Sequence, residues 1–464
     1  MRFITLLFSA ILLAGCSSSP STPSQSLPDP LKLDVTSFKL SNGLQVLVLE
    51  DDRLPVYSLY TFYKVGGKDE RKGITGASHF LEHLMFKGTK TIAASKFDYL
   101  VEGNGGSSNA YTSNDLTVYH ENMPTSTLDL MLSVEADRMV NLVIKKDEFE
   151  QERQVVQEER KMRYENSPRG QVYLRTMEEL FRGTPYGTSV IGDIADLKTV
   201  SRDQIYRYYR QWYAPNNATI VIVGDVRAGN VKDIVKKHFG ELAASDVPEQ
   251  SRASVPASAF VPQLKAPVEV ALKGQSVSPM FMLSYPAARS GAPEAFAQDI
   301  LSSALGDGKS SHLVQKFVLS KRPRVASIYA ANYTLEKAGM FMVGGELVRG
   351  VDPLRFKNDL LKELKGSCSA AITERSIQKV KNQYEAGLFR QLDTSAGLAQ
   401  FIGDRQSLYG DWAYYRKELQ IYRGLTVKDV QSACQRMFAQ PAHVWVTVWE
   451  KNPGERAGSV GSVQ

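Results

Sequence analysis

Apolar and polar positions alternate in short runs near the start of the chain, in residues 38–67. The alternation is clearest in 45–49, and residues 56–64 are rich in β-branched and aromatic side chains. An Asn-Gly pair at 42–43 marks a turn between such runs. This segment therefore predicts three strands joined by turns, because successive side chains of a half-buried strand point to the core and to solvent in turn.

Longer stretches with the 3.6-residue periodicity of amphipathic helices follow. They cover 75–86, 93–103, 125–140, 147–164 and 201–213. Asp147 is the expected N-cap of the fourth stretch. Two strand patterns interrupt the helices: a Thr- and Tyr-rich stretch at 107–124 and a continuous apolar run within 213–226. Grouped strands with helices between them predict an α+β fold.

The same order of elements recurs after a Ser-, Pro- and Ala-rich stretch at 244–265, which is typical of an interdomain linker. Residues 280–311 repeat the strand, loop, helix and Gly-containing turn of 58–89, and 430–449 resembles 205–224. Two weak matches in the same order, about 220 residues apart, indicate a duplicated domain. The expected domains are 35–243 and 266–450, followed by a flexible tail at 451–464.

The first sixteen residues have the pattern of a secretory signal peptide. One arginine precedes an apolar run from Phe3 to Ala14, and small residues lead to Cys16. The run is shorter than the roughly 20 residues that span a bilayer, which argues against a retained membrane helix. The letters "LAGC" resemble the bacterial lipobox, in which the cysteine is lipidated and becomes the new N-terminus. Ordinary cleavage near the same place is the alternative.

Residues 17–34 are rich in Ser and Pro and cannot bury a core, so we expect them to act as a tether. Ser17 directly after the cysteine, in place of Asp, would suit sorting to the outer membrane of a double-membraned bacterium. The expected location is therefore the periplasm, with the lipid anchor as the only attachment to the membrane.

Composition and net charge mainly exclude classes of function. The chain has 464 residues, 43% of them hydrophobic, and a formal net charge of +6 from 56 basic and 50 acidic residues. A nucleic-acid-binding protein would gather its basic residues into a patch, so nucleic acid is not an expected partner. The chain has two cysteines apart from Cys16. These two, Cys368 and Cys434, could form a disulfide in an oxidising compartment or remain two buried thiols.

The strongest chemical signal is "HFLEH", which begins at His79 in a chain with only 6 histidines. On an α-helix His79, Glu82 and His83 share one face, because positions i, i+3 and i+4 are neighbours. Two imidazoles one turn apart can hold a zinc ion, and the carboxylate can act as general base toward water. A chance pattern on an amphipathic helix is a poor alternative. The second domain has Ser302 and Ser303 in place of Glu82 and His83, so the chemistry belongs to the first.

A catalytic zinc site normally has three protein ligands, so a third ligand is required. The charge-rich helix in 148–168 supplies the candidates. Glu152 and Glu159 are two helical turns apart and face one side, and Glu158 and Glu165 form a second such pair. Spacing alone does not choose between the pairs, and the same residues are typical of a solvated helix face.

The motif "HFLEHLMFKGT" followed by "ERQVVQEE" resembles the inverted-motif zinc peptidases, the family of pitrilysin, insulysin and the mitochondrial processing peptidase. The resemblance covers nearly the whole chain, from about residue 36 to 450, and it implies one zinc ion per chain. The implied ligands are His79, His83 and Glu159. The family also implies that Glu82 is the base and that Glu152 steadies the site from behind the ligands.

The resemblance further implies two homologous αβ-sandwich domains that face each other as a clamshell, in chains that associate around a chamber. The letters "NAYTSNDLTVY" at 109–119 match the family's edge strand beside the zinc, where the substrate adds as another β-strand. Asn109 and Ala110 would lie nearest the scissile bond. Without the resemblance, this segment is typical of a plain amphipathic edge strand.

One part of the family pattern is missing from the second domain. Self-sufficient members carry an Arg and a Tyr seven residues apart after a G-x-S-S-R-L turn, and these bind substrate and stabilise the oxyanion. Aligned on the serines of "GDGKSS", this chain has His312 at the turn arginine, Val318 at the Arg and Val325 at the Tyr. Valine cannot donate a hydrogen bond, and a shifted alignment to Arg324 or Tyr329 would restore one group but not both.

The sequence therefore favours a lipid-anchored periplasmic zinc endopeptidase that cleaves peptides or unfolded protein segments. The missing pair indicates a homologous, zinc-less partner subunit that supplies it, so the chain alone would be weak or inactive. The alternative is a non-catalytic scaffold or assembly subunit with the same fold, and the intact ligand set argues against it. A purely structural zinc site would normally be closed by four ligands rich in cysteine.

Overall fold

The computed structural model describes residues 31–247, 255–274 and 278–449. The predicted signal peptide at 1–16, with Cys16, and the predicted tail at 451–464 lie outside the described residues, as does most of the predicted tether at 17–34. The described residues from Leu33 onward belong to one compact unit. Among the described residues, no helix combines the length and the apolar character needed to span a membrane.

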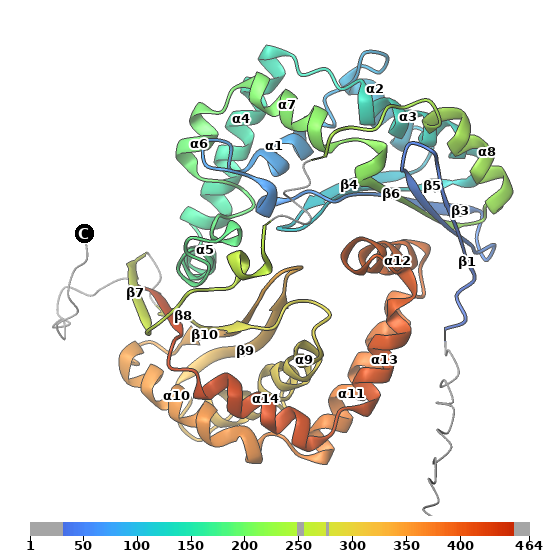
Figure 1. The fold of residues 1–464 in the computed structure, drawn as a ribbon. Helices are drawn as coiled ribbons and strands as arrows, with labels where there is room; N and C mark the ends of the chain where they lie inside the picture. The colour runs from blue at the N-terminus through green and yellow to red at the C-terminus, as the bar shows by residue number, and fades with distance from the viewer. Residues whose placement is uncertain (1–30, 248–254, 275–277, 450–464) are drawn as a thin grey trace, which may run out of the picture. The chain divides into compact units, whose positions relative to one another are not determined.

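The first half of the chain forms a six-stranded mixed sheet (Figure 1). In order across the sheet its strands are β1 (Val35–Lys39), β2 (Gln45–Glu50), β6 (Ala218–Gly224), β3 (Val56–Tyr63), β5 (Thr117–Pro124) and β4 (Ser107–Thr112). Strands β2 and β6 are parallel, and the other neighbours are antiparallel. The continuous apolar run of β6 fits its central place, because every residue of this strand is buried.

The second half repeats this layout in a five-stranded sheet. Its order is β7 (Val268–Lys273), β11 (Val444–Trp449), β8 (Met280–Ala287), β10 (Gly339–Leu347) and β9 (Val325–Thr334). Apart from β1, the two sheets have the same strand order and the same single parallel pair, β2–β6 in the first and β7–β11 in the second. The predicted duplication of an α+β domain is therefore confirmed.

Fourteen α-helices are present in the described residues, and they divide between the halves. The first half contains α1 (Ala77–Leu84), α2 (Ala94–Glu102), α3 (Leu128–Val140), α4 (Lys146–Arg160), α5 (Pro168–Leu180), α6 (Ile194–Thr199), α7 (Arg202–Trp212) and α8 (Ala228–Phe239). The second half contains α9 (Pro293–Gly306), α10 (Pro353–Ala370), α11 (Glu374–Gln391), α12 (Ser395–Tyr409), α13 (Tyr415–Gly424) and α14 (Val427–Ala439). Helices α1, α3, α7 and α8 lie over one face of the first sheet (Figure 1) and share its hydrophobic core.

The start of α4 differs from the expectation. The prediction that Asp147 is its N-cap is wrong, because Lys145 is the residue with extended backbone and the helix begins at Lys146. Asp147 lies in the first turn instead, where a negative charge is favourable at the positive end of the helix dipole. After Arg160 the chain continues as a π-helical turn, Lys161–Glu165.

Each half covers the sheet of the other with one helix. Helix α5 packs on β8 and β11, and α12 packs on β3 and β6. A Cβ at Gly403 of α12 would lie 2.0 Å from the ring of Phe62 on β3, so only glycine allows this close approach. The described part of the predicted linker also packs, because Phe260 is buried against Tyr186.

The two remaining cysteines form a disulfide. Cys368 on α10 and Cys434 on α14 are both buried in the second core, with their Cα atoms 5.6 Å apart. The sequence left a disulfide and two free thiols open as alternatives, and the structure contains the disulfide.

Candidate metal centre

Helix α1 carries the two histidines of the motif, and a buried carboxylate fixes its start. Glu70 accepts hydrogen bonds from the backbone N–H groups of Gly76 (2.6 Å) and Ser78 (2.7 Å). Gly76 has a φ of +84°, and a Cβ there would lie 2.6 Å from the carbonyl oxygen of Ile191, so a side chain does not fit. Phe80 is fully buried on the core side of the helix, which leaves the histidine face turned toward α4.

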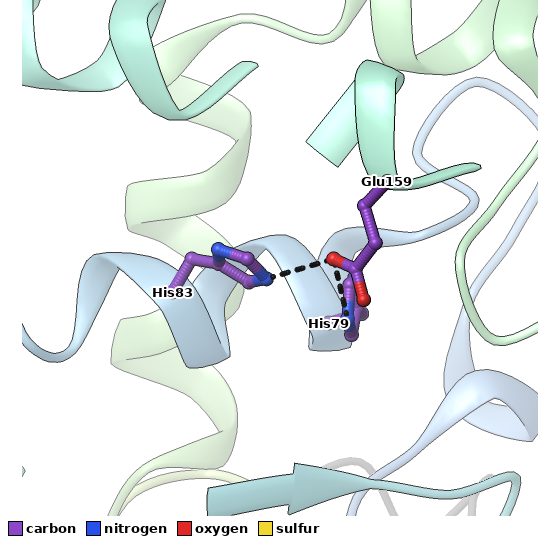
Figure 2. A group of neighbouring side chains, drawn as sticks. All are labelled: His79, His83 and Glu159. Carbon is purple, nitrogen blue, oxygen red and sulfur yellow. Dashed lines mark ion pairs between the residues drawn. The ribbon is translucent and has the colours of Figure 1, made fainter. Parts of the chain in front are cut away.

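Glu159 on α4 approaches both histidines. Its Oε2 atom lies 3.6 Å from Nε2 of His79 and 3.3 Å from Nε2 of His83. Figure 2 shows the carboxylate close to both imidazoles. One ligand atom from each of the three residues lies within 4.8 Å of the others, and no further group of this kind occurs among the described residues. The structure therefore brings together the three residues that the family resemblance implies as ligands.

The spacing of these atoms fits one zinc ion. Zinc bonds to nitrogen and oxygen are about 2.0–2.2 Å long, so neighbouring ligand atoms of a tetrahedral site lie roughly 3.4 Å apart. Both distances from Glu159 are close to this value. Imidazole nitrogen and carboxylate oxygen are also common zinc donors. Three protein ligands leave the fourth position open, as in catalytic sites.

The Nδ1 atoms of the two histidines, their outer nitrogens, differ in their contacts. Nδ1 of His83 lies 3.2 Å from Oε2 of Glu152, and Oε1 of Glu152 lies 2.7 Å from Nζ of Lys87. Nδ1 of His79, in contrast, is buried without a hydrogen-bond partner among the described residues. Glu152 therefore occupies the supporting position that the family resemblance implies, but it contacts one histidine only.

The surroundings favour the protonation state that metal binding needs at His79 and Glu159, but not at His83. Burial lowers the pKa of His79 to about 4, and the neighbouring His83 acts in the same direction. Burial also opposes protonation of His83, but hydrogen bonds to Glu159 and Glu152 outweigh it and raise the pKa of His83. The hydrogen bond with His83 lowers the pKa of Glu159. His79 is therefore neutral and Glu159 anionic at neutral pH.

Glu82 has an environment suited to a general base. Burial raises the pKa of Glu82, while a hydrogen bond from the hydroxyl of Thr112 lowers it again. Arg163, which lies 3.0 Å from Oε1 of Glu159, also favours the charged form of Glu82. A carboxylate whose pKa is raised toward the working pH can accept and return a proton.

The structure also separates the two glutamate pairs that spacing left open. Glu158 and Glu165 are exposed and form ion pairs with Lys161 (3.6 Å) and Arg160 (3.3 Å). Glu152 and Glu159 face α1 instead. Only Glu152 and Glu159 can therefore contribute to the candidate metal centre.

The predicted substrate strand is β4, at one edge of the first sheet. Asn109 pairs with His120 and Ala110 with Tyr119 of β5, and the other edge of β4 has no strand partner among the described residues. Asn109 is exposed, while Ala110 packs against the core. Because β4 also contacts α1, a free backbone edge lies next to the helix that carries the two histidines.

The second half offers no Arg/Tyr pair in the aligned positions. Val325 is fully buried and Val318 packs against the second core. His312 forms an ion pair with a glutamate of α10 at 2.7 Å. Arg324 forms an ion pair with an aspartate of the same helix at 2.6 Å. The ring of Tyr329 has a guanidinium carbon of α5 over it, 5.7 Å from the ring centroid.

Three residues that contact the glutamates of the site were not identified from the sequence: Lys87, Thr112 and Arg163. Arg163 follows Glu159 by four positions, in the π-helical turn that continues α4; this spacing allows an ion pair and was available as a signal. Lys87 and Thr112 reach the site only through the packing of α1 against α4 and β4, which no local pattern encodes.

Comparison with known proteins agrees with this geometry. Residues 47–194 match the family described as insulinase (peptidase family M16), and residues 199–384 match the peptidase M16 inactive domain. The zinc protease PqqE of Helicobacter pylori is 32% identical over 414 residues, which cover 87% of this chain and 90% of that protein. An uncharacterised zinc protease of Mycobacterium leprae is 26% identical over 402 residues, 86% of this chain and 88% of that protein.

Solved structures show the same fold. A protease from Helicobacter pylori superimposes with a TM-score of 0.82 at 29% identity, covering 90% of this chain and 100% of that one. A peptidase M16 inactive domain structure from Pseudomonas fluorescens has a TM-score of 0.79 at 16% identity, covering 90% of this chain and 98% of that one. The chain therefore belongs to the M16 (insulinase and pitrilysin-like) family of peptidases.

Proposed function

We propose that this chain is a zinc-dependent endopeptidase that cleaves peptides or unfolded protein segments. The observation that carries the proposal is the approach of one Glu159 oxygen to the Nε2 atoms of His79 and His83, at distances that suit a tetrahedral zinc site. The carboxylate of Glu82 lies on the same helix face as these histidines. Relatives that are named zinc proteases support the same chemistry.

His79, His83 and Glu159 would hold the ion, and zinc would supply a Lewis acid for the carbonyl of the scissile peptide bond. Glu82 would take a proton from the attacking water and return it to the leaving amine. The free edge of β4 would align the substrate by main-chain hydrogen bonds, with Asn109 and Ala110 nearest the scissile bond.

A homologous partner subunit is part of the proposal. The aligned positions Val318 and Val325 carry no donor for the oxyanion, and loss of one such donor typically costs about 3–4 kcal/mol in the transition state. The partner would supply the Arg/Tyr pair and would itself lack zinc. Assays of the chain alone and of the chain with a co-encoded homologue should show a rise in peptide hydrolysis of at least a hundredfold. Full activity of the isolated chain would refute this requirement.

The proposed location is the periplasm, with Cys16 lipidated and anchored in the outer membrane. The lipobox-like "LAGC" and the Ser/Pro-rich tether support this location. The disulfide between Cys368 and Cys434 supports an oxidising compartment, because cytosolic thiols are kept reduced. Mass spectrometry of the mature N-terminus should find a diacylglyceryl cysteine, and Cys16→Ser should remove both the lipid and the sedimentation with outer membranes.

A second candidate function is a non-catalytic assembly subunit. The match to the inactive domain and the missing Arg/Tyr pair favour it. Metal analysis of the wild type and of Glu82→Gln separates the candidates. A peptidase binds one zinc per chain in both proteins and loses turnover only in the variant. A scaffold shows the same negligible turnover in both, even with the partner present.

A further inference from the structure

We propose that Lys87 is a positioning residue of the metal centre, which acts on the ligand His83 through Glu152. The proposal rests on the zinc site proposed above and adds a residue outside the histidine motif. Lys87 follows the end of α1 by three residues, and its backbone N–H donates to the carbonyl of Leu84 at 3.0 Å. The lysine is therefore held on the same helix end as His83.

A continuous chain of contacts leads from the lysine to the ligand. Nζ of Lys87 lies 2.7 Å from Oε1 of Glu152, and Oε2 of the same carboxylate lies 3.2 Å from Nδ1 of His83. The Glu152 side chain is only 10% exposed, so few waters can replace either partner. Both carboxylate oxygens are thus occupied, one by a cation and one by the imidazole.

The two contacts fix the orientation of the Glu152 carboxylate more firmly than one contact could. A carboxylate with one partner can rotate about its side-chain bonds, whereas a carboxylate held at both oxygens keeps its plane. The plane of Glu152 sets the orientation of the His83 ring, and with it the direction of Nε2 toward Glu159. Hydrogen-bonded partners of this kind commonly orient metal-binding histidines.

The second histidine makes this support more important. Nδ1 of His79 is buried without a partner among the described residues, so its ring is held by packing and not by a hydrogen bond. Of the two imidazoles, only that of His83 has a fixed outer nitrogen. We therefore expect the metal affinity of the site to depend on the Lys87–Glu152 pair.

The sign of the effect separates positioning from simple electrostatics. Lys87 and zinc are both cations, so direct repulsion predicts that removing the lysine charge tightens zinc binding. Positioning predicts the opposite, because a released Glu152 no longer orients His83. The two explanations cannot both account for one measured change in the dissociation constant.

The test is the zinc dissociation constant of the full chain, measured by competition with a chromophoric chelator. Glu152→Gln should bind zinc about 10–100-fold more weakly, the usual cost of removing an outer partner of a metal ligand. Lys87→Met should weaken binding by roughly 5–10-fold, which is no more than the loss expected for Glu152→Gln. Lys87→Arg should restore wild-type affinity. Lys90→Met, at an exposed lysine of the same loop, should change nothing.

The double variant Lys87→Met/Glu152→Gln tests the route. If Lys87 acts only through Glu152, the double variant binds zinc as weakly as Glu152→Gln and no more weakly. Unchanged or tighter binding by Lys87→Met, or additive losses in the double variant, would overturn the proposal. If Lys87→Met does not fold, Lys87→Gln takes its place with the same expected direction.

These measurements are independent of the proposed peptidase activity. A wild-type chain that binds zinc but cleaves no peptide even with the partner subunit present would contradict the proposed function, and the role of Lys87 would still be decided by the zinc dissociation constants. A wild-type chain that cleaves peptides while Lys87→Met keeps full zinc affinity would refute the role of Lys87 alone.

Discussion

The hydroxyl of Thr112 donates a hydrogen bond to the carboxylate of Glu82, although the two residues are 30 positions apart. Thr112 is the last residue of the edge strand β4, and Glu82 lies on the helix that carries the histidines. The bond therefore links the strand expected to bind substrate to the residue expected to move the proton. It also lowers the pKa of Glu82, against the effect of burial.

Removing this hydroxyl should impair turnover without loss of metal. In Thr112→Val the carboxylate of Glu82 loses its fixed partner but stays in place, so we expect kcat to fall on the order of tenfold, less than the roughly 10²–10⁴-fold that a general base contributes. Thr112→Ser keeps the donor and should retain most activity. The measurements are kcat with the partner subunit present and zinc content by mass spectrometry. A loss of zinc in Thr112→Val would contradict the role assigned to this contact.

Removing a ligand should abolish the stabilisation that the metal provides. A bound ion stabilises the fold by about 2.7 kcal/mol when its free concentration is 100 times the dissociation constant. A chelator should therefore lower the Tm of the wild type by several degrees and leave the Tm of Glu159→Ala unchanged. Glu158→Ala, on the exposed face of the same helix, is the matched control. It should respond to the chelator as the wild type does.

Much of the fold could be predicted from the sequence because its signals are local. Period-two alternation in 45–49 and helical periodicity in 75–86 place β2 and α1 within a few residues, and the internal repeat predicts the second domain. The choice of Lys145 over Asp147 as N-cap depends on where the preceding loop enters the helix, which the pattern does not encode.

The site was predicted in part for the same reason. His79, Glu82 and His83 share a helix turn, so their meeting follows from spacing alone. The choice of Glu159 over Glu158 needs the angle at which α4 crosses α1, and only the family resemblance supplied it. Contacts through Lys87 and Thr112 depend on side chains that approach from other elements, and no local pattern predicts them.

The disulfide should contribute strongly to stability. It joins residues 66 positions apart, and closing a loop of that length in the unfolded chain is worth about 4 kcal/mol in the chain-entropy model. The double variant Cys368→Ala/Cys434→Ala should therefore unfold at a clearly lower urea concentration. Dithiothreitol should lower the urea midpoint of the wild type and leave that of the double variant unchanged. An equal response of both proteins would show that the bond does not form in solution.

Asp404 should make the packing of α12 on the first sheet depend on pH. Burial raises the pKa of Asp404 to about 7, against a weaker lowering by Arg405. Tyr60 of β3 and Tyr111 of β4 lie near this carboxyl group. Burial raises the pKa of both tyrosines most, and the negative charge of Asp404 raises it further. The carboxyl group is therefore held in the folded protein without the solvation that its charged form needs.

The sign of the effect follows from the direction of the shift. An aspartate has a pKa of about 3.9 in an unfolded chain, so the folded state binds the proton more tightly. The resulting stability is fully present below about pH 4 and is lost as the pH rises through about 7. A difference of about 3 pKa units corresponds to at most about 4 kcal/mol.

Asp404→Asn removes the titration while keeping the shape of the side chain. We expect the wild type to lose stability relative to Asp404→Asn as the pH rises from 5 to 8.5, by up to about 3 kcal/mol, because about 2 of the 3 pKa units lie within this range. Urea unfolding of both proteins at each pH measures this difference. Asp393→Asn, whose side chain is 83% exposed, should show no such trend. A stability difference that stays constant between pH 5 and 8.5 would mean that Asp404 is already charged in the folded protein, and that α12 packs on the sheet independently of this proton.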